Sequence, residues 1–481
     1  MDIELKNIAL IEEGNLELKG ITLIADENNS GKSTIGKTLF TTLTTLNNFE
    51  REFLTNLSQR IKTLHFTLRE VIDERLENEL GKIVEQNFLT KIKKFTEKID
   101  NFSKNIDQII KNFIKIEINE KYFKDLENAF FELIEDTDIL KKELETYIEK
   151  KNVESDSMLV LGITFLVNSL NNLLTFKAIF NYEKVKLSSF QRTFDREFEN
   201  NINNVFLNKE KSSVILNENG DLIKISIDNN RVSSVSFTYG KIKKESSTIY
   251  IESPLILDYI DELSRTSVSI FDNENRYFFD KNYKIKVLKN ALKNEKKIDI
   301  VDTVLGKEEL YKDLLEKIHK IILGEFEYNK SNKDFIYRKQ GYTFDKKNVA
   351  TGIKSFGIIE ILLKNKQLDE NTILIIDEPE VHLHPKWQIK YAEILILISK
   401  ELGVKILLNS HSPYLIRAME VYRKTHDYEE NIKFYTLTDC TEGKSKKIID
   451  VTNNLNKIFD KLIEPYEILR EVDERYSDDE W

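Results

Sequence analysis

Cysteine, proline and glycine are scarce in this sequence. Among 481 residues there are one cysteine, five prolines and fifteen glycines. The single thiol, Cys440, cannot form an internal disulfide, and the opening residues MDIELKNIAL lack the basic and long apolar regions of a secretory signal. We therefore predict a protein of the reducing cytoplasm. Because proline and glycine interrupt helices, their scarcity also favours long helical segments.

Positive charge is not in excess either. The chain has 72 basic and 82 acidic residues, a formal net charge of −10. A field of this sign does not attract nucleic acid, so direct binding of DNA or RNA would depend on local basic patches. A length of 481 residues exceeds that of one ordinary core and predicts about two or three structural units.

A long uninterrupted hydrophobic run is missing as well. The most apolar stretch, residues 158–180, carries Asn168, Asn171, Asn172 and Lys177. A membrane span needs about 20 predominantly apolar residues, and polar side chains are costly inside a bilayer. We predict a buried helix here and no membrane association.

What the sequence does contain is a near-match to a phosphate-binding loop. Residues 25–34 are ADENNSGKST, and the pattern G-x-x-x-x-G-K-[ST] is satisfied at Gly31, Lys32 and Ser33. Asp26 replaces the opening glycine. Because aspartate tolerates unusual backbone angles, we expect that Asp26 does not break the loop. Since its charge lies at the far end of the loop from Lys32, we expect it to weaken ATP affinity only modestly.

The context of this loop fits phosphate binding. Two strands are predicted over IELKNIALI and NLELKGITLIAD, with a turn near Glu13–Gly14, and helical spacing begins after Thr34. Backbone N–H groups at the start of a helix can cradle phosphates, with Lys32 as a point charge and Ser33 as a magnesium ligand. The predicted loop contacts are Asn28, Asn29, Ser30, Gly31, Lys32, Ser33 and Thr34.

A second chemical motif ends the apolar run TILIID, residues 372–377. Asp377, at the end of this predicted strand, can hold the same magnesium ion. Glu378 can orient or deprotonate the water that attacks the γ-phosphate. Acidic pairs are common on protein surfaces, but this pair follows a buried strand in a chain that also carries a phosphate loop. We therefore predict that the pair is catalytic.

The next predicted strand, residues 404–411, ends at His411. At that position the imidazole can reach the γ-phosphate and sense its presence. Between the two strands lies a helix that Pro385 opens and Gly403 closes. Strand–helix–strand connectivity predicts parallel pairing through a right-handed crossover.

The segment HLHP raises the question of a metal site. His382 and His384 lie two apart, but no cysteine or third ligand accompanies them, so we predict no zinc site. We find no acidic cluster besides Asp377 and Glu378, and no histidine pattern typical of a nuclease.

Changes of composition along the chain predict six segments. A proline-free helical segment follows the loop, and Asn219–Gly220 and Asn229–Asn230 mark the turns of an antiparallel meander. The segments are 1–46, an N-terminal segment with the phosphate loop; 47–210, a helical insertion; 211–253, the meander; 254–329, a second helical insertion; 330–450, a C-terminal α/β segment with Asp377, Glu378 and His411; and 451–481, a helix with an acidic tail. The predicted fold class is α/β.

Apolar residues recur at helical spacing in the last segment, as they do in the first insertion. In the last segment they are Leu455, Ile458, Leu462, Tyr466 and Leu469; in the insertion they are Leu54, Leu57, Ile61, Leu64 and Leu68. We expect the face of the last helix to pack on the core, with docking of a partner as the alternative.

Together, NNSGKST, IIDEPEVHLHPKWQ and LLNSHSPYLI resemble the ABC/SMC-like ATPases of the OLD and PtuA kind, found in bacterial anti-phage systems such as Septu and some retrons. The resemblance covers roughly residues 1–46 and 330–420. It implies a P-loop NTPase head of ABC/SMC type with a large, partly coiled-coil-like helical insertion and a small β meander.

The resemblance also implies how ATP would be shared. Residues 349–365, VATGIKSFGIIEILLKN, stand where that family carries its signature segment. Thr351 and Gly352 would contact the γ-phosphate of ATP held by a partner subunit, since two heads of such ATPases sandwich two ATP molecules. A homodimer or a higher assembly of dimers is therefore implied. Gln191 is the candidate for the glutamine that senses magnesium.

The function implied is a Mg-dependent ATPase that controls a separate anti-phage effector, with its turnover rate left open. OLD nucleases carry a TOPRIM domain after the head, but only 65 residues (481 minus 416) follow Ile416, too few for one. We therefore expect the effector, a nuclease of HNH or TOPRIM type, to be another protein. The alternative is an SMC- or RecF-like DNA repair ATPase that binds DNA directly, which would need a basic groove; a transporter motor fits the long insertion less well.

Overall fold

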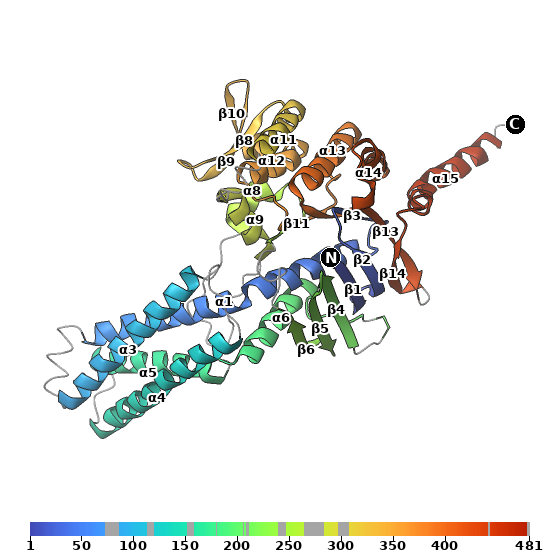
Figure 1. Cartoon of the computed structure of the whole chain (residues 1–481). Coiled ribbons are helices and arrows are strands. Elements are labelled where there is room, and N and C mark those ends of the chain that lie inside the picture. The colour runs from blue at the N-terminus through green and yellow to red at the C-terminus, as the bar shows by residue number, and fades with distance from the viewer. Residues whose placement is uncertain are drawn as a thin grey trace. The chain divides into compact units, whose positions relative to one another are not determined.

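The structure is a computed structural model (Figure 1). Its described residues form two compact units, Met1–Leu46 with Phe190–Trp481, and Asn47–Ser189. The described ranges are 1–72, 86–112, 120–151, 158–178, 180–204, 206–207, 211–238, 247–263, 283–296, 307–440 and 443–478.

The unit Asn47–Ser189 is built from long helices. Helix α1, Lys32–Ile72, begins at the phosphate loop and continues into this unit, where its predicted stripe from Leu54 to Leu68 is buried. The other helices are α3 (Gln86–Lys111), α4 (Glu120–Lys151), α5 (Met158–Leu174), the short 3-10 helix η1 (Thr175–Ala178) and the first part of α6 (Tyr182–Phe198), whose residues from Phe190 on belong to the other unit. The described helices of the predicted 47–210 insertion thus end at Phe198.

Helix α5 is the apolar stretch that the sequence singles out. Its Leu166, Leu170 and Leu173 are buried, spaced so that they share one face of the helix. Among the helices of the described ranges, none is long and apolar enough to span a membrane.

An eleven-stranded sheet organises the described part of the other unit, in the order β6-β5-β4-β1-β2-β14-β13-β3-β12-β11-β7. The strands are β1 (Asp2–Ile8), β2 (Ile11–Glu17), β3 (Ile21–Ala25), β4 (Lys211–Glu218), β5 (Asp221–Asp228), β6 (Arg231–Phe237), β7 (Ser247–Ile251), β11 (Thr372–Asp377), β12 (Lys405–Ser410), β13 (Ile432–Cys440) and β14 (Ser445–Asp450). The run β13-β3-β12-β11-β7 is parallel, and β6-β5-β4-β1-β2 is antiparallel.

The predicted turn at Glu13–Gly14 is wrong. The chain turns instead between Ile8 and Ile11, where Ala9 has a φ of 46°, and Gly14 lies inside β2. A Cβ at Gly14 would lie 2.3 Å from Cδ1 of Ile448 on β14. This glycine therefore serves a close approach of two strands, which the local sequence cannot distinguish from a turn.

The meander is smaller than predicted. Strands β4, β5 and β6 form it, and the predicted turns at Asn219–Gly220 and Asn229–Asn230 are confirmed, since all four residues have positive φ. β7, predicted to belong to it, pairs in parallel with β11 instead. The physical reason is burial on both faces: Thr248 to Ile251 are all buried, as is typical of a strand covered by helices.

The second predicted helical insertion, 254–329, ends earlier than expected. It contains α8 (Ile256–Leu263), α9 (Tyr283–Lys293) and α11 (Lys307–Ile322), but a three-stranded antiparallel sheet begins at Glu325. Its strands are β8 (Glu325–Asn329), β9 (Asp334–Lys339) and β10 (Tyr342–Asp345), followed by η2 (Lys346–Asn348) and α12 (Thr351–Lys364). Alternating apolar residues in EFEYN mark β8 as a strand.

Helix α13, Pro385–Leu402, joins β11 to β12 as predicted. His384 caps its N-terminus, and Gly403 ends it in the left-handed conformation with a φ of 71°. Beyond β12 come α14 (Pro413–Thr425), the short η3 (Glu429–Asn431) and the hairpin of β13 and β14. Together with the sheet, these elements confirm the predicted α/β fold.

The last helix, α15 (Asn456–Asp478), packs only at its start and leads out to the C-terminus (Figure 1). Leu455 and Ile458 are buried, and Leu462 packs against the core. Tyr466 and Leu469 are 69% and 64% exposed. The prediction that this face packs on the core is therefore right for its first half and wrong for its second.

Candidate functional site

The predicted site residues meet at one edge of the parallel strands. Ser410 of β12 pairs with Ala25 of β3, and Asp377 of β11 pairs with Asn409 of β12. The phosphate loop, the residues after Asp377 and the residues after Ser410 therefore leave the sheet side by side. Carboxyl ends of parallel strands are where α/β proteins bind their ligands.

The phosphate loop has the backbone that its sequence predicts. Asn29 and Gly31 have φ values of 61° and 96°, and the amide of Thr34 donates to the carbonyl of Gly31 at 3.1 Å. Helix α1 begins at Lys32, so the unpaired N–H groups of its first turn face the loop. A Cβ at Gly31 would lie 3.3 Å from Ile11, which adds a packing reason for glycine to its positive φ.

Lys32 folds back across its own loop. Its ammonium donates to the main-chain oxygen of Asp26 at 2.9 Å and to that of Glu27. Burial lowers the pKa of Lys32 below its ordinary value, and the nearby carboxylates of Glu378 and Asp26 oppose that shift. The lysine is therefore a sheltered cation, and a phosphate oxygen would compete with two loop carbonyls for its protons.

Asp377 is held from two sides. The amide nitrogen of Asn409 donates to its Oδ1 at 2.9 Å, and the hydroxyl of Tyr250 donates to its Oδ2 at 3.1 Å. Burial raises the pKa of Tyr250 well above its usual range, so this hydroxyl keeps its proton. Each carboxylate oxygen retains a lone pair, and the orientation suits a fixed metal ligand.

Neither of these two partners of Asp377 is predicted from the sequence. Asn409 precedes the predicted switch histidine by two residues, and Tyr250 lies in an apolar strand that is distant in sequence. The signal for Asn409 was its place at a strand end. No local signal marks Tyr250, because only the parallel pairing of β7 with β11 brings it to Asp377.

Glu378 has an uncommon backbone. Its φ is 44°, in the left-handed region, and its amide donates to the carbonyl of Asn409 at 2.9 Å. Non-glycine residues in this region are uncommon and recur at active sites. Its side chain is 37% exposed, and its Oε1 lies 3.7 Å from Nδ1 of His411. The predicted base and the predicted sensor are thus neighbours.

Glu380 is a third carboxylate at this edge, contrary to the expectation that Asp377 and Glu378 stand alone. It is buried, and its Oε1 accepts from the hydroxyl of Ser410 and from the amide of His411, both at 2.7 Å. Nδ1 of His411 approaches the same oxygen at 3.3 Å, within ion-pair distance but without hydrogen-bond geometry. The spacing of DEPE, with its second acid two residues after Glu378, was the signal that pointed to it.

Four buried polar atoms around this edge have no hydrogen-bond partner within the described residues. They are Oγ of Ser30, Oε2 of Glu380, Oδ1 of Asn409 and Nδ1 of His411. Unpaired buried polar atoms are costly, and their gathering at one place indicates a polar ligand. The donor set fits ATP and Mg²⁺: amides, lysine and histidine for phosphate, and hydroxyl and carboxylate oxygens for a hard cation.

The predicted signature residues begin α12. Thr351 is its first residue, and Ala350, in the N-cap position, provides no side-chain cap. Gly352 packs against the histidine-rich segment, since a Cβ there would lie 3.1 Å from the carbonyl of His382. His384 caps α13, accepting from the amide of Lys386 at 3.2 Å. Of the two histidines, His384 thus has a structural role at the start of α13.

Gln191, the candidate glutamine, lies in α6 and contacts the meander. Its amide nitrogen donates to Asp195 and to the carbonyl of Asn230, while its Oε1 accepts from the amide of Val232. These contacts fix α6 to the turn between β5 and β6. Ile376 of β11 pairs in parallel with Ile251 of β7, so the residues that follow them, Asp377 and Glu252, lie beside each other.

A separate cluster of histidine and carboxylates lies between α11, β8 and α12. Ligand atoms of His319, Glu325 and Glu360 come within 4.8 Å of one another. The ammonium of Lys364 lies among them, 2.7 Å from Glu360 and 3.1 Å from Glu325. A fixed cation from the chain itself therefore takes the place that a metal would need.

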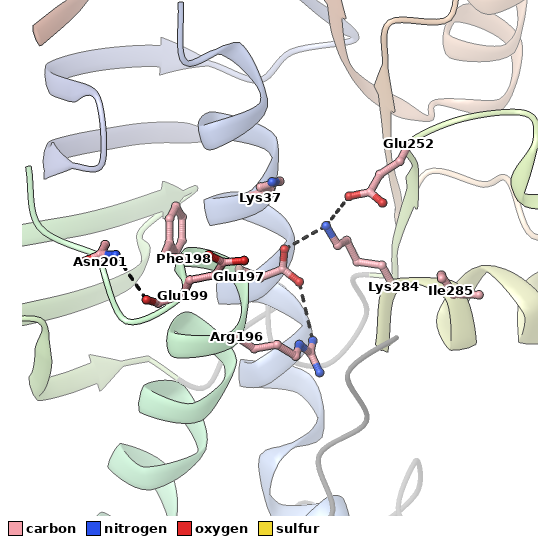
Figure 2. Close-up of a pocket in the computed structure, with 9 residues that line it drawn as sticks. All are labelled: Lys37, Arg196, Glu197, Phe198, Glu199, Asn201, Glu252, Lys284 and Ile285. Atoms are coloured by element: carbon pink, nitrogen blue, oxygen red, sulfur yellow. Dashed lines mark hydrogen bonds and ion pairs between the residues drawn. The ribbon is translucent and has the colours of Figure 1, made fainter. Parts of the chain in front are cut away.

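A cavity of about 460 Å³ opens beside α6 and α9 (Figure 2). Figure 2 shows Lys284 between Glu197 and Glu252, with Glu197 2.8 Å from its ammonium. Arg196 lies 3.8 Å from Glu197. Because acidic side chains offset these cations, the cavity does not form a basic groove.

One family model matches most of the chain. Residues 27–417 match the family model described as AAA domain, putative AbiEii toxin, Type IV TA system. The chain belongs to this family. It therefore carries a P-loop ATPase domain of AAA type, which implies nucleotide binding. Among curated proteins, none matches the chain.

Solved structures similar to this chain include SMC head domains. The SMC head domain from Thermotoga maritima is 9% identical with a TM-score of 0.35, covering 94% of this chain and 98% of its own. An Smc head bound to the C-winged helix domain of ScpA is 9% identical with a TM-score of 0.38, covering 93% and 96%. The Smc head with a coiled coil and joint from Pyrococcus yayanosii is 10% identical with a TM-score of 0.32, covering 97% and 99%.

Proposed function

We propose that the chain is a Mg-dependent ATPase that converts ATP and water to ADP and phosphate. The observation that carries the proposal is the convergence of Lys32, Asp377, Glu378 and His411 at the carboxyl ends of β3, β11 and β12. The loop from Asn28 to Thr34 would bind the phosphates, and Ser33 with Asp377 would hold Mg²⁺.

Each residue would do its part from the position described. Lys32 would exchange loop carbonyls for phosphate oxygens and neutralise charge that develops during phosphoryl transfer. When bound, Mg²⁺ would neutralise charge on the β- and γ-phosphates. Glu378 would accept a hydrogen bond from the attacking water and fix its line of approach.

His411 would contact the γ-phosphate from the end of β12. Its main-chain amide is anchored on Glu380, so the histidine is fixed at its base while Nδ1 has no hydrogen-bond partner among the described residues. An unpaired ring nitrogen near Glu378 suits a group that must report the state of the phosphate. Glu380 acts here as the support of His411.

A second copy of the chain would complete the site. By resemblance, Thr351 and Gly352 would contact ATP bound to a partner head, giving a homodimer or a higher assembly of dimers. The start of α12 supports this, because its first N–H groups lack a side-chain cap and a helix N-terminus favours phosphate.

We further propose that this ATPase belongs to an anti-phage system of the OLD or PtuA kind, as in Septu or retrons, and controls a separate nuclease effector. The family description, a putative toxin of a Type IV TA system, supports a role in such two-component systems. Among the described residues, the cluster of His319, Glu325 and Glu360 already holds the ammonium of Lys364 where a metal ion would bind. It therefore does not support a nuclease site in this chain, and we place the nuclease in another protein. Copurification from the native operon should yield a second protein. If no second protein copurifies and no adjacent gene encodes an effector, the proposal of a separate effector is contradicted.

The alternative, direct DNA binding by an SMC- or RecF-like repair ATPase, needs a basic groove. The cations of the cavity in Figure 2 are offset by Glu197 and Glu252. Salt-dependent binding of the purified chain to plain duplex DNA would favour a DNA repair ATPase over an ATPase that controls a separate effector.

Two substitutions test hydrolysis. Lys32→Ala should abolish ATP binding, because it removes the buried cation of the loop. Glu378→Gln should keep ATP bound and slow turnover by about 100-fold, the contribution typical of a positioned general base. Turnover measured by phosphate release, with ATP binding measured in parallel, separates the two. Equal turnover in the parent and in Glu378→Gln would refute the assignment of Glu378.

A further inference from the structure

Asp26, which stands where the phosphate-loop pattern has glycine, is anchored outside the loop. Its side chain is only 4% exposed. Its Oδ2 accepts from the amide of Leu437 on β13 at 2.8 Å and from the hydroxyl of Thr436 at 3.4 Å. It also forms an ion pair at 3.2 Å with the ammonium of Lys461, on the C-terminal helix α15. A glycine could make none of these side-chain contacts.

The other carboxylate oxygen of Asp26 acts on the loop itself. Oδ1 accepts from the amide of Glu27 at 2.8 Å and lies 3.3 Å from the ammonium of Lys461. The main-chain oxygen of Asp26 accepts from Lys32. Asp26 thus connects α15, β13 and Lys32 of the phosphate loop.

Lys461 occupies a defined place on α15. It lies one turn after Ile458, which is 1% exposed, and its ammonium also donates to the carbonyl of Leu437. Beyond this point the apolar side chains of Tyr466 and Leu469 are exposed. Lys461 is therefore at the boundary between the packed half of the helix and its free half.

We propose that Lys461 is a positioning residue of the phosphate loop, and that through Asp26 it couples α15 to the nucleotide site. The ammonium neutralises a buried carboxylate that would otherwise be costly, so it stabilises the loop conformation in which Asp26 holds Glu27. Such coupling is reciprocal: a change in α15 alters nucleotide affinity, and a bound nucleotide stabilises α15. Only the coupling to nucleotide rests on the proposed ATPase function.

The positioning role can be tested without nucleotide, by hydrogen–deuterium exchange of the full chain. In Lys461→Met, the amides of Glu27 and Leu437 should exchange about tenfold faster, as expected when a charge-assisted contact is lost. Lys461→Arg should restore protection, and Lys457→Met, on an exposed lysine one turn earlier, should match the parent. Unchanged exchange at both amides in Lys461→Met would overturn the proposal.

The reverse substitution guards against a general loss of stability. Asp26→Gly installs the residue that the loop pattern expects, and it should speed exchange in α15 around residues 458–462 while leaving β11 and β12 protected. If α15 exchanges as in the parent, Asp26 does not hold the helix and the proposal fails.

The coupling is tested by adding Mg·ATP. In the parent, exchange in α15 should slow, and in Lys461→Met this response should be lost, with ATP bound about tenfold more weakly. An equal response in both proteins would overturn the coupling. If the parent binds no ATP, the ATPase proposal and the coupling fall together, and the experiments without nucleotide still decide the positioning role.

Discussion

Two clusters of histidine and glutamate in the same unit have opposite hydrogen-bond states. At the end of β12, Glu380 and His411 each retain a buried polar atom without a partner in the described chain. Beside α12, Glu360 uses both of its oxygens: Oε1 contacts His319 at 2.8 Å and Lys364 at 2.7 Å, and Oε2 accepts from the amide of Phe326 at 2.9 Å. Both carboxylates are buried, so burial alone does not distinguish them.

The difference teaches how to separate a functional cluster from a structural one. A buried carboxylate with all its partners supplied by the chain holds elements together, here α11, β8 and α12. A buried carboxylate with an unpaired oxygen, beside other unpaired atoms, is incomplete without a ligand. Histidine and glutamate occur in both clusters, but Lys364 adds a cation to the one beside α12, and the completeness of the network differs.

The largest effect should come from the two histidines. His411→Ala should lower ATP turnover by about 100-fold, because it removes a group that would contact the γ-phosphate in the transition state. His319→Ala is the matched control and should leave turnover unchanged, since His319 only completes the contacts of Glu360. Steady-state phosphate release by both variants is the measurement. Comparable losses in the two would erase the distinction between the clusters.

The two glutamates should show the reverse pattern in stability. Glu360→Gln should destabilise the fold by about 2 kcal/mol, because charge-assisted contacts to Lys364 and His319 are lost at a fully buried site. Glu380→Gln should cost less, since one of its oxygens is already unpaired. Thermal unfolding of both variants, with turnover measured beside it, gives the comparison. A lower midpoint for Glu380→Gln than for Glu360→Gln would contradict it.

Local signals account for the parts of the fold that the sequence predicts. The phosphate loop, the turns of the meander and the limits of α13 each depend on residues close together in sequence, such as Pro385 and Gly403. The strand before the phosphate loop and the helix after it are predictable for the same reason. In contrast, Gly14 resembles a turn locally, and only its contact with Ile448 explains its place inside β2.

The site divides in the same way. Lys32, Asp377, Glu378 and His411 could be named from motifs, since each lies at the end of a predicted strand or beyond it. The support around them comes from pairing across the sheet: Tyr250 reaches Asp377 from β7. From the sequence, Asp26 can be interpreted only as a replacement of the loop glycine. Its ion pair is with Lys461, 435 positions away, and no local pattern predicts that contact.

A packing change beside Glu360 tests the cluster at α12 without changing any of its charged side chains. Gly357 of α12 faces Phe326, and an added Cβ would lie 2.3 Å from Cδ2 of that ring. Gly357→Ala should therefore lower stability by about 1–2 kcal/mol through overpacking. Adding Phe326→Leu should recover part of the loss, as measured by thermal unfolding. If the double variant is no more stable than Gly357→Ala alone, the ring is not the cause.

The smallest effect should come from the support of Asp377. Tyr250→Phe removes one of its two hydrogen bonds but keeps Asn409 and the aromatic ring, over which Lys284 lies at 4.8 Å. The Mg²⁺ concentration for half-maximal turnover should rise by about threefold, because one neutral hydrogen bond contributes a fraction of the metal's binding energy. Tyr435→Phe, which removes a hydroxyl bonded to Glu17, should leave that concentration unchanged. An unchanged Mg²⁺ requirement in Tyr250→Phe would mean that Asn409 alone orients the carboxylate.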